Sequence, residues 1–313
     1  MRVTSNMQNQ NLIKSMTTNQ AKVASMQTQL ASGSKLNYAS DNPTAIPSIM
    51  DADKMLNKID IYENNITFLN GEASVTESTL GQVTELLQRL SVLATEAANG
   101  TNGADQLKLI NNEVKQIREQ LVGLANTSYD NQFIFAGNKI STIPFEITDD
   151  GSIVYKGTPD KDNYMRKYSI SDGVSIGVNL PGDSVFGYSN LVSAGPPPEY
   201  EGEGIFQIVN ELVATLDLDT PDYDAIRGKL TPISNEINNV LAARTEIGGF
   251  QSRLQMTKEQ HENGRITYNS LKAELKDIDI AQVVSDLSAQ QVSLQASLYA
   301  GSQIMSISLL SYL

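Results

Sequence analysis

The feature that most constrains this chain is a seven-residue repeat between positions 59 and 97. Mostly apolar residues recur there at alternating steps of three and four, which places them on one stripe of an α-helix and is typical of a coiled coil. No proline interrupts the pattern after Pro47, so one helix can extend from Ser48 to Ala98. At 1.5 Å per residue that helix is roughly 75 Å long, which predicts a rod-shaped protein. The stripe consists of Ile59, Tyr62, Ile66, Leu69, Ala73, Thr76, Leu80, Val83, Leu87, Leu90, Ala94 and Ala97.

Shorter stretches with the same spacing predict further helices on both sides of this one. The first ends near Gly33, because glycine favours a helix end, and Asp41-Asn42-Pro43 has the composition of a helix start. Residues 107–124 should form a helix that folds back on the long one, because the connection between them is short. Helices resume at residues 205–216, and heptad spacing then continues through residues 230–278 and 280–312.

Between residues 139 and 200 the pattern changes to that of short β-strands. Apolar residues alternate with small or polar ones over residues 174–180, which predicts a half-buried strand. Asp172-Gly173 and Asp149-Asp150-Gly151 are typical of hairpin turns. We therefore expect a mainly α-helical protein with an inserted small β domain. Because both ends of the insert must return to the helices, we expect it to be separable from the helical core.

These boundaries divide the chain into three predicted domains. Residues 1–45 and 280–313 form a terminal coiled-coil assembly domain. Residues 46–138 and 228–279 form a helical rod, and residues 139–227 form an outer β-rich insert with a short helix.

The two ends carry few charges, although the whole chain has a formal net charge of −13. Asp286 is the one charged residue between positions 280 and 313. Charge-poor helices with apolar stripes indicate burial against other chains, with flexible polar tails as the alternative. The residues that we predict to form this assembly interface are Leu12, Met16, Val23, Met26, Leu30, Val284, Leu287, Leu294, Leu298, Met305, Leu309 and Leu310.

Composition and motifs argue against catalysis and cofactor binding. The chain has no cysteine and a single histidine, His261, which lies in a polar stretch and is expected at the surface. The acidic run from Asp217 to Asp224 lacks calcium-loop spacing, because Pro221 occupies the place of a ligand, so we interpret it as a loop and helix cap. We therefore predict no enzyme activity, no metal and no cofactor. The acidic charge disfavours nucleic acid as a partner, no apolar run is long enough to span a membrane, and a secretory signal peptide is not evident.

Three motifs, taken together, resemble the flagellin family. Residues 30–43, Leu-Ala-Ser-Gly-Ser-Lys-Leu-Asn-Tyr-Ala-Ser-Asp-Asn-Pro, resemble the family's N-terminal motif. Residues 125–137, Ala-Asn-Thr-Ser-Tyr-Asp-Asn-Gln-Phe-Ile-Phe-Ala-Gly, resemble its exit from helix to hairpin. Residues 243–254, Ala-Arg-Thr-Glu-Ile-Gly-Gly-Phe-Gln-Ser-Arg-Leu, resemble its C-terminal core helix. The resemblance covers most of residues 1–138 and 228–313, whereas the β insert matches nothing familiar.

The resemblance implies a structural subunit of the bacterial flagellum. The first seven and last six residues are more similar to the subunit that joins hook to filament than to the filament subunit. The partners so implied are hook-associated protein 1 on the hook side, flagellin on the filament side, further copies in a ring, and an export chaperone. The implied location is extracellular, after export through the flagellar type III apparatus. The alternatives are the filament subunit itself and a monomeric coiled-coil adaptor.

Overall fold

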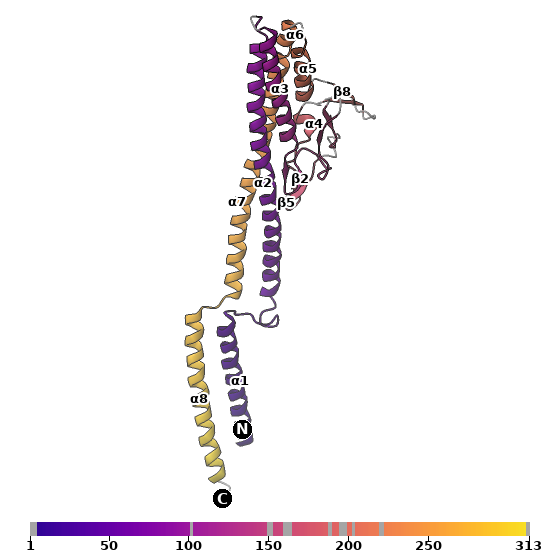
Figure 1. The fold of residues 1–313 in the computed structure, drawn as a ribbon. Coiled ribbons are helices and arrows are strands. Elements are labelled where there is room, and N and C mark those ends of the chain that lie inside the picture. The colour runs from indigo at the N-terminus through magenta and orange to yellow at the C-terminus, as the bar shows by residue number, and fades with distance from the viewer. Residues whose placement is uncertain are drawn as a thin grey trace. The chain divides into compact units, whose positions relative to one another are not determined.

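The computed structural model describes residues 5–100, 103–148, 153–158, 165–186, 190–193, 199–201, 204–218 and 222–310 (Figure 1). For residues 5, 6, 8, 9, 190–193, 199–201 and 304–310 it describes the backbone alone. The chain forms two compact units, one of residues 1–59 and 262–313 and the other of residues 60–261. The helices α2 (Ala45–Ala97) and α7 (Leu230–Lys276) each contribute to both units.

Helices make up most of the described chain, which confirms the predicted fold class. The helices are α1 (Ser5–Ser32), α2, α3 (Ala104–Ala125), α4 (Gly182–Val185), α5 (Ile205–Leu216), α6 (Tyr223–Gly228), α7 and α8 (Ile280–Leu310). The strands form antiparallel hairpins, β1 (Ser128–Tyr129) with β2 (Gln132–Phe133), β3 (Phe145–Ile147) with β4 (Ile153–Tyr155), β5 (Tyr168–Ser171) with β6 (Val174–Ile176), and β7 (Asn190–Ser193) with β8 (Glu199–Glu201).

Local signals place the helix ends as predicted. Gly33 follows α1 with a φ of 69°, a backbone conformation that glycine adopts without steric cost. The side chain of Asn42 caps the start of α2. Its Oδ1 accepts hydrogen bonds from the backbone N–H groups of Thr44 and Ala45, each at 3.2 Å. The side chain of Asp222 caps α6 by accepting from the Ala225 N–H at 3.0 Å, as expected for a capping role of the acidic run.

The unit of residues 60–261 is held together by the predicted apolar stripes. The stripe of α2 is buried from Ile66 to Ala97, and α3 contributes Leu107, Ile110, Val114, Ile117 and Leu121. In α7, Ile233, Val240, Ile247 and Leu254 are buried at steps of seven. His261 is the next residue at that step and is only 8% exposed, so its predicted surface position is wrong. The polar neighbours of His261 in sequence lie on other faces of the same helix.

The insert packs on the helices, so the expectation of a separable insert is not supported. Phe145 of β3 contacts Phe186 at a ring-centroid distance of 5.2 Å and Phe206 of α5 at 5.1 Å, and all three side chains belong to the same buried core as α2 and α3. Asn126, just after α3, pairs with both backbone groups of Phe145, donating to its carbonyl at 2.8 Å and accepting from its N–H at 2.9 Å. The insert therefore completes the core of this unit.

The predicted strand over residues 174–180 is wrong in its second half. The strand β6 ends at Ile176, and the residues from Gly177 to Leu180 are all buried and do not alternate. Asn179, expected on the exposed face, accepts a hydrogen bond from the Arg166 N–H at 3.0 Å and is 2% exposed. This segment runs inside the fold, where side chains on both faces are covered.

Candidate assembly interface

The two helices at the chain ends, α1 and α8, pair antiparallel with each other. Leu12 lies against Gly301, where an added Cβ would approach the Leu12 Cδ2 to 3.0 Å. At the other end, Ser34 forms a β-bridge with Asp277, and the Lys35 N–H donates to the Lys276 carbonyl at 2.6 Å. The seam of the pair is only half-buried along α1, at Leu12, Met16, Asn19, Val23, Met26 and Leu30.

The seam of α8 differs from the predicted one at alternate positions. Leu287 and Leu294 lie in the seam as expected, and Gly301 lies there as well. Val284 and Leu298 do not, because their side chains are 45% and 49% exposed. The side chains that take the alternate seam positions are those of Val283, Gln290 and Ser297.

A polar layer explains this choice of face. Asn19 accepts a hydrogen bond from the Gln290 Nε2 at 2.9 Å, and its Nδ2 donates to the Ser297 Oγ at 3.3 Å. Periodicity alone favoured the larger apolar residues of α8, such as Val284 and Leu298. One signal in the sequence pointed to the layer. Asn19 needs a polar partner when half-buried, and Gln290 and Ser297 offer two such partners seven residues apart.

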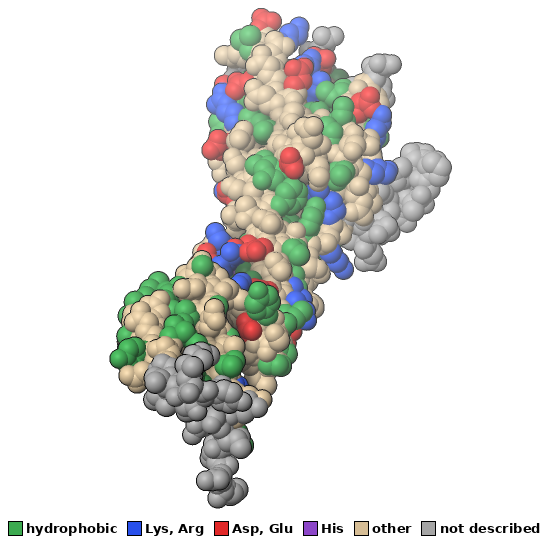
Figure 2. All heavy atoms as spheres, turned by 90° about the horizontal axis from the view of Figure 1, so that it is seen from below, with side chains coloured by type: hydrophobic (Ala, Val, Ile, Leu, Met, Phe, Trp, Pro, Cys, Tyr) green, Lys and Arg blue, Asp and Glu red, His purple; other side chains and the backbone are tan. Residues whose placement is uncertain are grey.

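Large apolar side chains lie on the outside of this pair. Val292 is 66% exposed, Tyr299 69%, and Ile280 63%, and α1 exposes Ile13. In Figure 2, which views the molecule from below, hydrophobic side chains gather in patches on the lower part of the face shown. The predicted residues Met305, Leu309 and Leu310 belong to α8, but their side chains lie outside the described residues. The pair therefore has polar residues within its seam and apolar residues facing solvent. A helix pair that is stable without partners shows the reverse arrangement.

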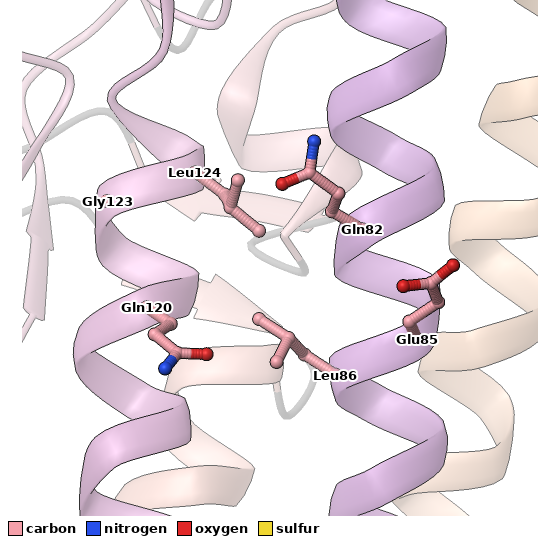
Figure 3. Close-up of a pocket in the computed structure, with 6 residues that line it drawn as sticks. All are labelled: Gln82, Glu85, Leu86, Gln120, Gly123 and Leu124. Atoms are coloured by element: carbon pink, nitrogen blue, oxygen red, sulfur yellow. The ribbon is translucent and has the colours of Figure 1, made fainter.

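A second candidate surface is a groove of about 430 Å³ between α2 and α3 (Figure 3). Leu86 of α2 and Leu124 of α3 point into it, and Gln82 and Gln120 flank them. These side chains offer apolar contact and amide hydrogen bonds. Glu85 is the one carboxylate in the lining, and neither a nucleophile nor a set of metal ligands lies beside it. In the part of the chain that the structure describes, no cluster of histidine and carboxylate side chains could hold a metal ion.

A buried ion pair lies between α2 and the insert. Glu72 of α2, 2% exposed, forms an ion pair with Arg166, which also donates to the Gln132 side chain. Burial raises the pKa of Glu72, against the lowering effect of the neighbouring guanidinium. Each charge has the other as its partner, so this pair fastens the insert to α2.

Comparison with known proteins agrees with the resemblance in sequence. A model of the bacterial flagellin N-terminal helical region matches residues 3–140, and one of the flagellin C-terminal helical region matches residues 230–313. The chain belongs to the flagellin family. Among the described residues of this family member, no helix is long and apolar enough to cross a membrane.

Individual relatives show which members of the family are most similar to this chain among those compared. Flagellar hook-associated protein 3 of Escherichia coli is 27% identical over 99% of this chain and 98% of its own length. Flagellin D of Vibrio cholerae is 24% identical over 86% of this chain and 87% of its own length. A solved flagellar hook-associated protein from Vibrio parahaemolyticus, 22% identical, superposes with a TM-score of 0.65 over 76% of this chain and all of its own. That likeness supports the flagellin-like fold.

Proposed function

We propose that this chain is the structural subunit of the bacterial flagellum that joins the hook to the filament. The observation that carries this proposal is the α1–α8 pair, whose apolar residues Ile280, Val292 and Tyr299 face outward. Similarity to a hook-associated protein over nearly the whole chain supports the junction over the filament subunit. The chain performs no catalysis in this role.

The assembly domain consists of residues 1–45 and 280–313, joined to a rod of residues 46–138 and 228–279 and an outer insert of residues 139–227. Within the pair, Leu12, Met16, Leu287 and Leu294 hold α1 on α8. Val284 and Leu298, which face away from this seam, contact neighbouring subunits in a ring. Covering each such large side chain contributes about 1.5–3 kcal/mol, so the exposed face favours association.

The partners are hook-associated protein 1 on the hook side and flagellin on the filament side. The subunit reaches the outside of the cell through the flagellar export apparatus, accompanied by a chaperone. A family member that forms the filament itself would differ in one respect: it would add to its own copies without limit. A monomeric adaptor would bind neither structure.

Electron microscopy of the purified chain, mixed with isolated hooks and with filaments, tests these three alternatives. We expect a short ring at the hook end that carries hook-associated protein 1, and renewed filament growth once flagellin is added. Long filaments of this chain alone would identify a filament subunit. If the chain binds neither hooks nor filaments, the result would support the monomeric coiled-coil adaptor.

A matched pair of variants tests the assembly face. Val292→Glu should leave melting unchanged, because Val292 is 66% exposed, yet it should prevent ring formation by placing a charge where another subunit packs. Met256→Glu, at an equally exposed position of α7 (62%), serves as the control and should assemble normally. Normal rings from Val292→Glu would contradict the proposed interface.

A further inference from the structure

The helix α3 covers only part of the α2 segment in the unit of residues 60–261. Arg89 of α2 forms an ion pair with Glu113 of α3 at 2.7 Å. Nearer the end of α3, Leu86 and Leu124 line the groove between the two helices. Tyr129, which follows the end of α3, lies so close to Gly71 that a Cβ there would overlap its hydroxyl. Because α3 runs antiparallel to α2, residues 60–70 of α2 lie beyond its end (Figure 1).

Residues beyond the end of α3 are nevertheless fully buried. Ile66 and Leu69 of α2 are 2% and 0% exposed, and Leu254 of α7 is 1% exposed. The cover at this level comes from the β5–β6 hairpin, whose Ile170 is 1% exposed. The ring of Tyr168 in β5 contacts Phe68 of α2 at a centroid distance of 5.4 Å. The hairpin thus covers residues 60–70 of α2 in the way that α3 covers the later residues of the same helix.

Polar side chains from both helices attach to this hairpin. The Tyr62 hydroxyl of α2 donates to the Asp172 Oδ1 at 2.9 Å, and the Asn65 Nδ2 donates to the Ser169 carbonyl at 2.8 Å.

From α7, the His261 Nε2 lies 2.6 Å from the Ile170 carbonyl. Because a carbonyl only accepts, Nε2 carries the proton. The rings of Tyr62 and His261 also stack at 5.5 Å, which joins α2 to α7 directly.

We propose that the β5–β6 hairpin is a clasp that holds α2 and α7 together over residues 60–70 and 254–261. Two helices alone bury one seam and are marginal in water, so a third layer over residues 60–70 stabilises the pair beyond the end of α3. The hairpin supplies that layer, and its hydrogen bonds to Tyr62, Asn65 and His261 determine where it sits. This role of the single histidine is independent of the proposed place of the chain in the flagellum.

Hydrogen exchange of the full chain, followed by mass spectrometry, tests the clasp. The triple variant Tyr62→Phe, Asn65→Leu, His261→Phe keeps the rings and the apolar volume but removes the three hydrogen bonds. Each bond changes an opening equilibrium by about fivefold. We expect amide exchange in residues 60–70 and 254–261 to accelerate at least tenfold, while residues 83–97 and 233–247 stay unchanged.

Two further variants separate the clasp from general destabilisation. Asn64→Leu alters an exposed neighbour at the same level and should leave exchange as in the parent chain. Gly173→Val strains the hairpin turn, where φ is 72° and the space around the new side chain is open, without touching either helix. It should accelerate exchange in the hairpin and in both helical segments. The proposal is overturned if the triple variant exchanges no faster than Asn64→Leu, or if Gly173→Val loosens only the hairpin.

Discussion

The unit of residues 60–261 and the α1–α8 pair use the same seven-residue spacing but bury it to different extents. In the first, Leu80, Leu87 and Val240 are at most 1% exposed. In the second, the seam residues of α1 are only half-buried, and one layer consists of Asn19, Gln290 and Ser297. In the first unit, α3, α5 and the insert add further layers to the α2 and α7 helices. The described part of the α1–α8 pair consists of two helices alone.

This difference shows that heptad spacing specifies which residues face a partner but not how many partners there are. A core with several layers is closed and stable within one chain. A two-helix pair with exposed apolar residues remains open, and further copies can complete it. Four substitutions measure the contrast, from the largest expected change in stability to the smallest.

Phe186→Ala should cause the largest loss, because the ring is fully buried and contacts Phe135, Phe145 and Phe206. Removing such a side chain costs about 3–5 kcal/mol in the free energy of unfolding. Chemical denaturation followed by circular dichroism measures it. A loss below about 1 kcal/mol would mean that the insert does not share the core of the helices.

Glu72→Ala should cost about 3 kcal/mol, because it leaves the buried guanidinium of Arg166 without its carboxylate. The control is Glu113→Ala, which breaks the Arg89 pair at the surface, where both side chains are more than 40% exposed. Exposed pairs contribute about 0–1 kcal/mol. Equal effects of the two substitutions, measured by denaturant unfolding, would show that burial of Glu72 has no energetic consequence.

Leu294→Ala should cost only about 1 kcal/mol, since its side chain is half-buried in the seam of the pair. The effect should be local, so hydrogen exchange along α1 and α8 is the appropriate measurement, with Val292→Ala as an exposed control. If Leu294→Ala destabilises as much as Phe186→Ala, the pair is packed as tightly as the core, and the comparison fails.

Asn19→Leu should change stability least, and it tests whether Asn19 sets the alignment of α1 with α8. A polar residue in a coiled-coil seam sets alignment at some cost in stability, so the substitution should raise the stability of the pair by less than about 1 kcal/mol.

Paired cysteines in the otherwise cysteine-free chain report the alignment. Leu12→Cys with Gly301→Cys should cross-link in the parent chain, and Leu12→Cys with Leu294→Cys only after Asn19→Leu. An unchanged pattern would show that Asn19 does not set the register.

Most of the fold followed from sequence, because long apolar stripes leave few ways to be buried. The buried stripe of α2 from Ile66 to Ala97 was predicted residue by residue, as were the end of α1 at Gly33 and the β5–β6 turn at Asp172-Gly173. For α7 the spacing predicted the helix, but not that His261 continues its buried face. The seam of α8 was predicted only at every second position. That helix is rich in serine, glutamine and small residues, so two neighbouring faces have nearly equal apolar character, and the choice between them depends on α1.

By itself, the sequence determined the long helices, the buried face of α2 and the absence of cysteine chemistry, because these depend on local spacing and composition. Only the tertiary structure decided which layer covers each stripe. His261 pairs with the carbonyl of Ile170, 91 residues away in sequence, and Asn179 pairs with the N–H of Arg166, so both polar side chains can be buried. The seam of α8 turns toward Gln290 and Ser297 because Asn19 lies opposite. Such pairings depend on which segments meet in space, and the period of a single helix carries no information about that.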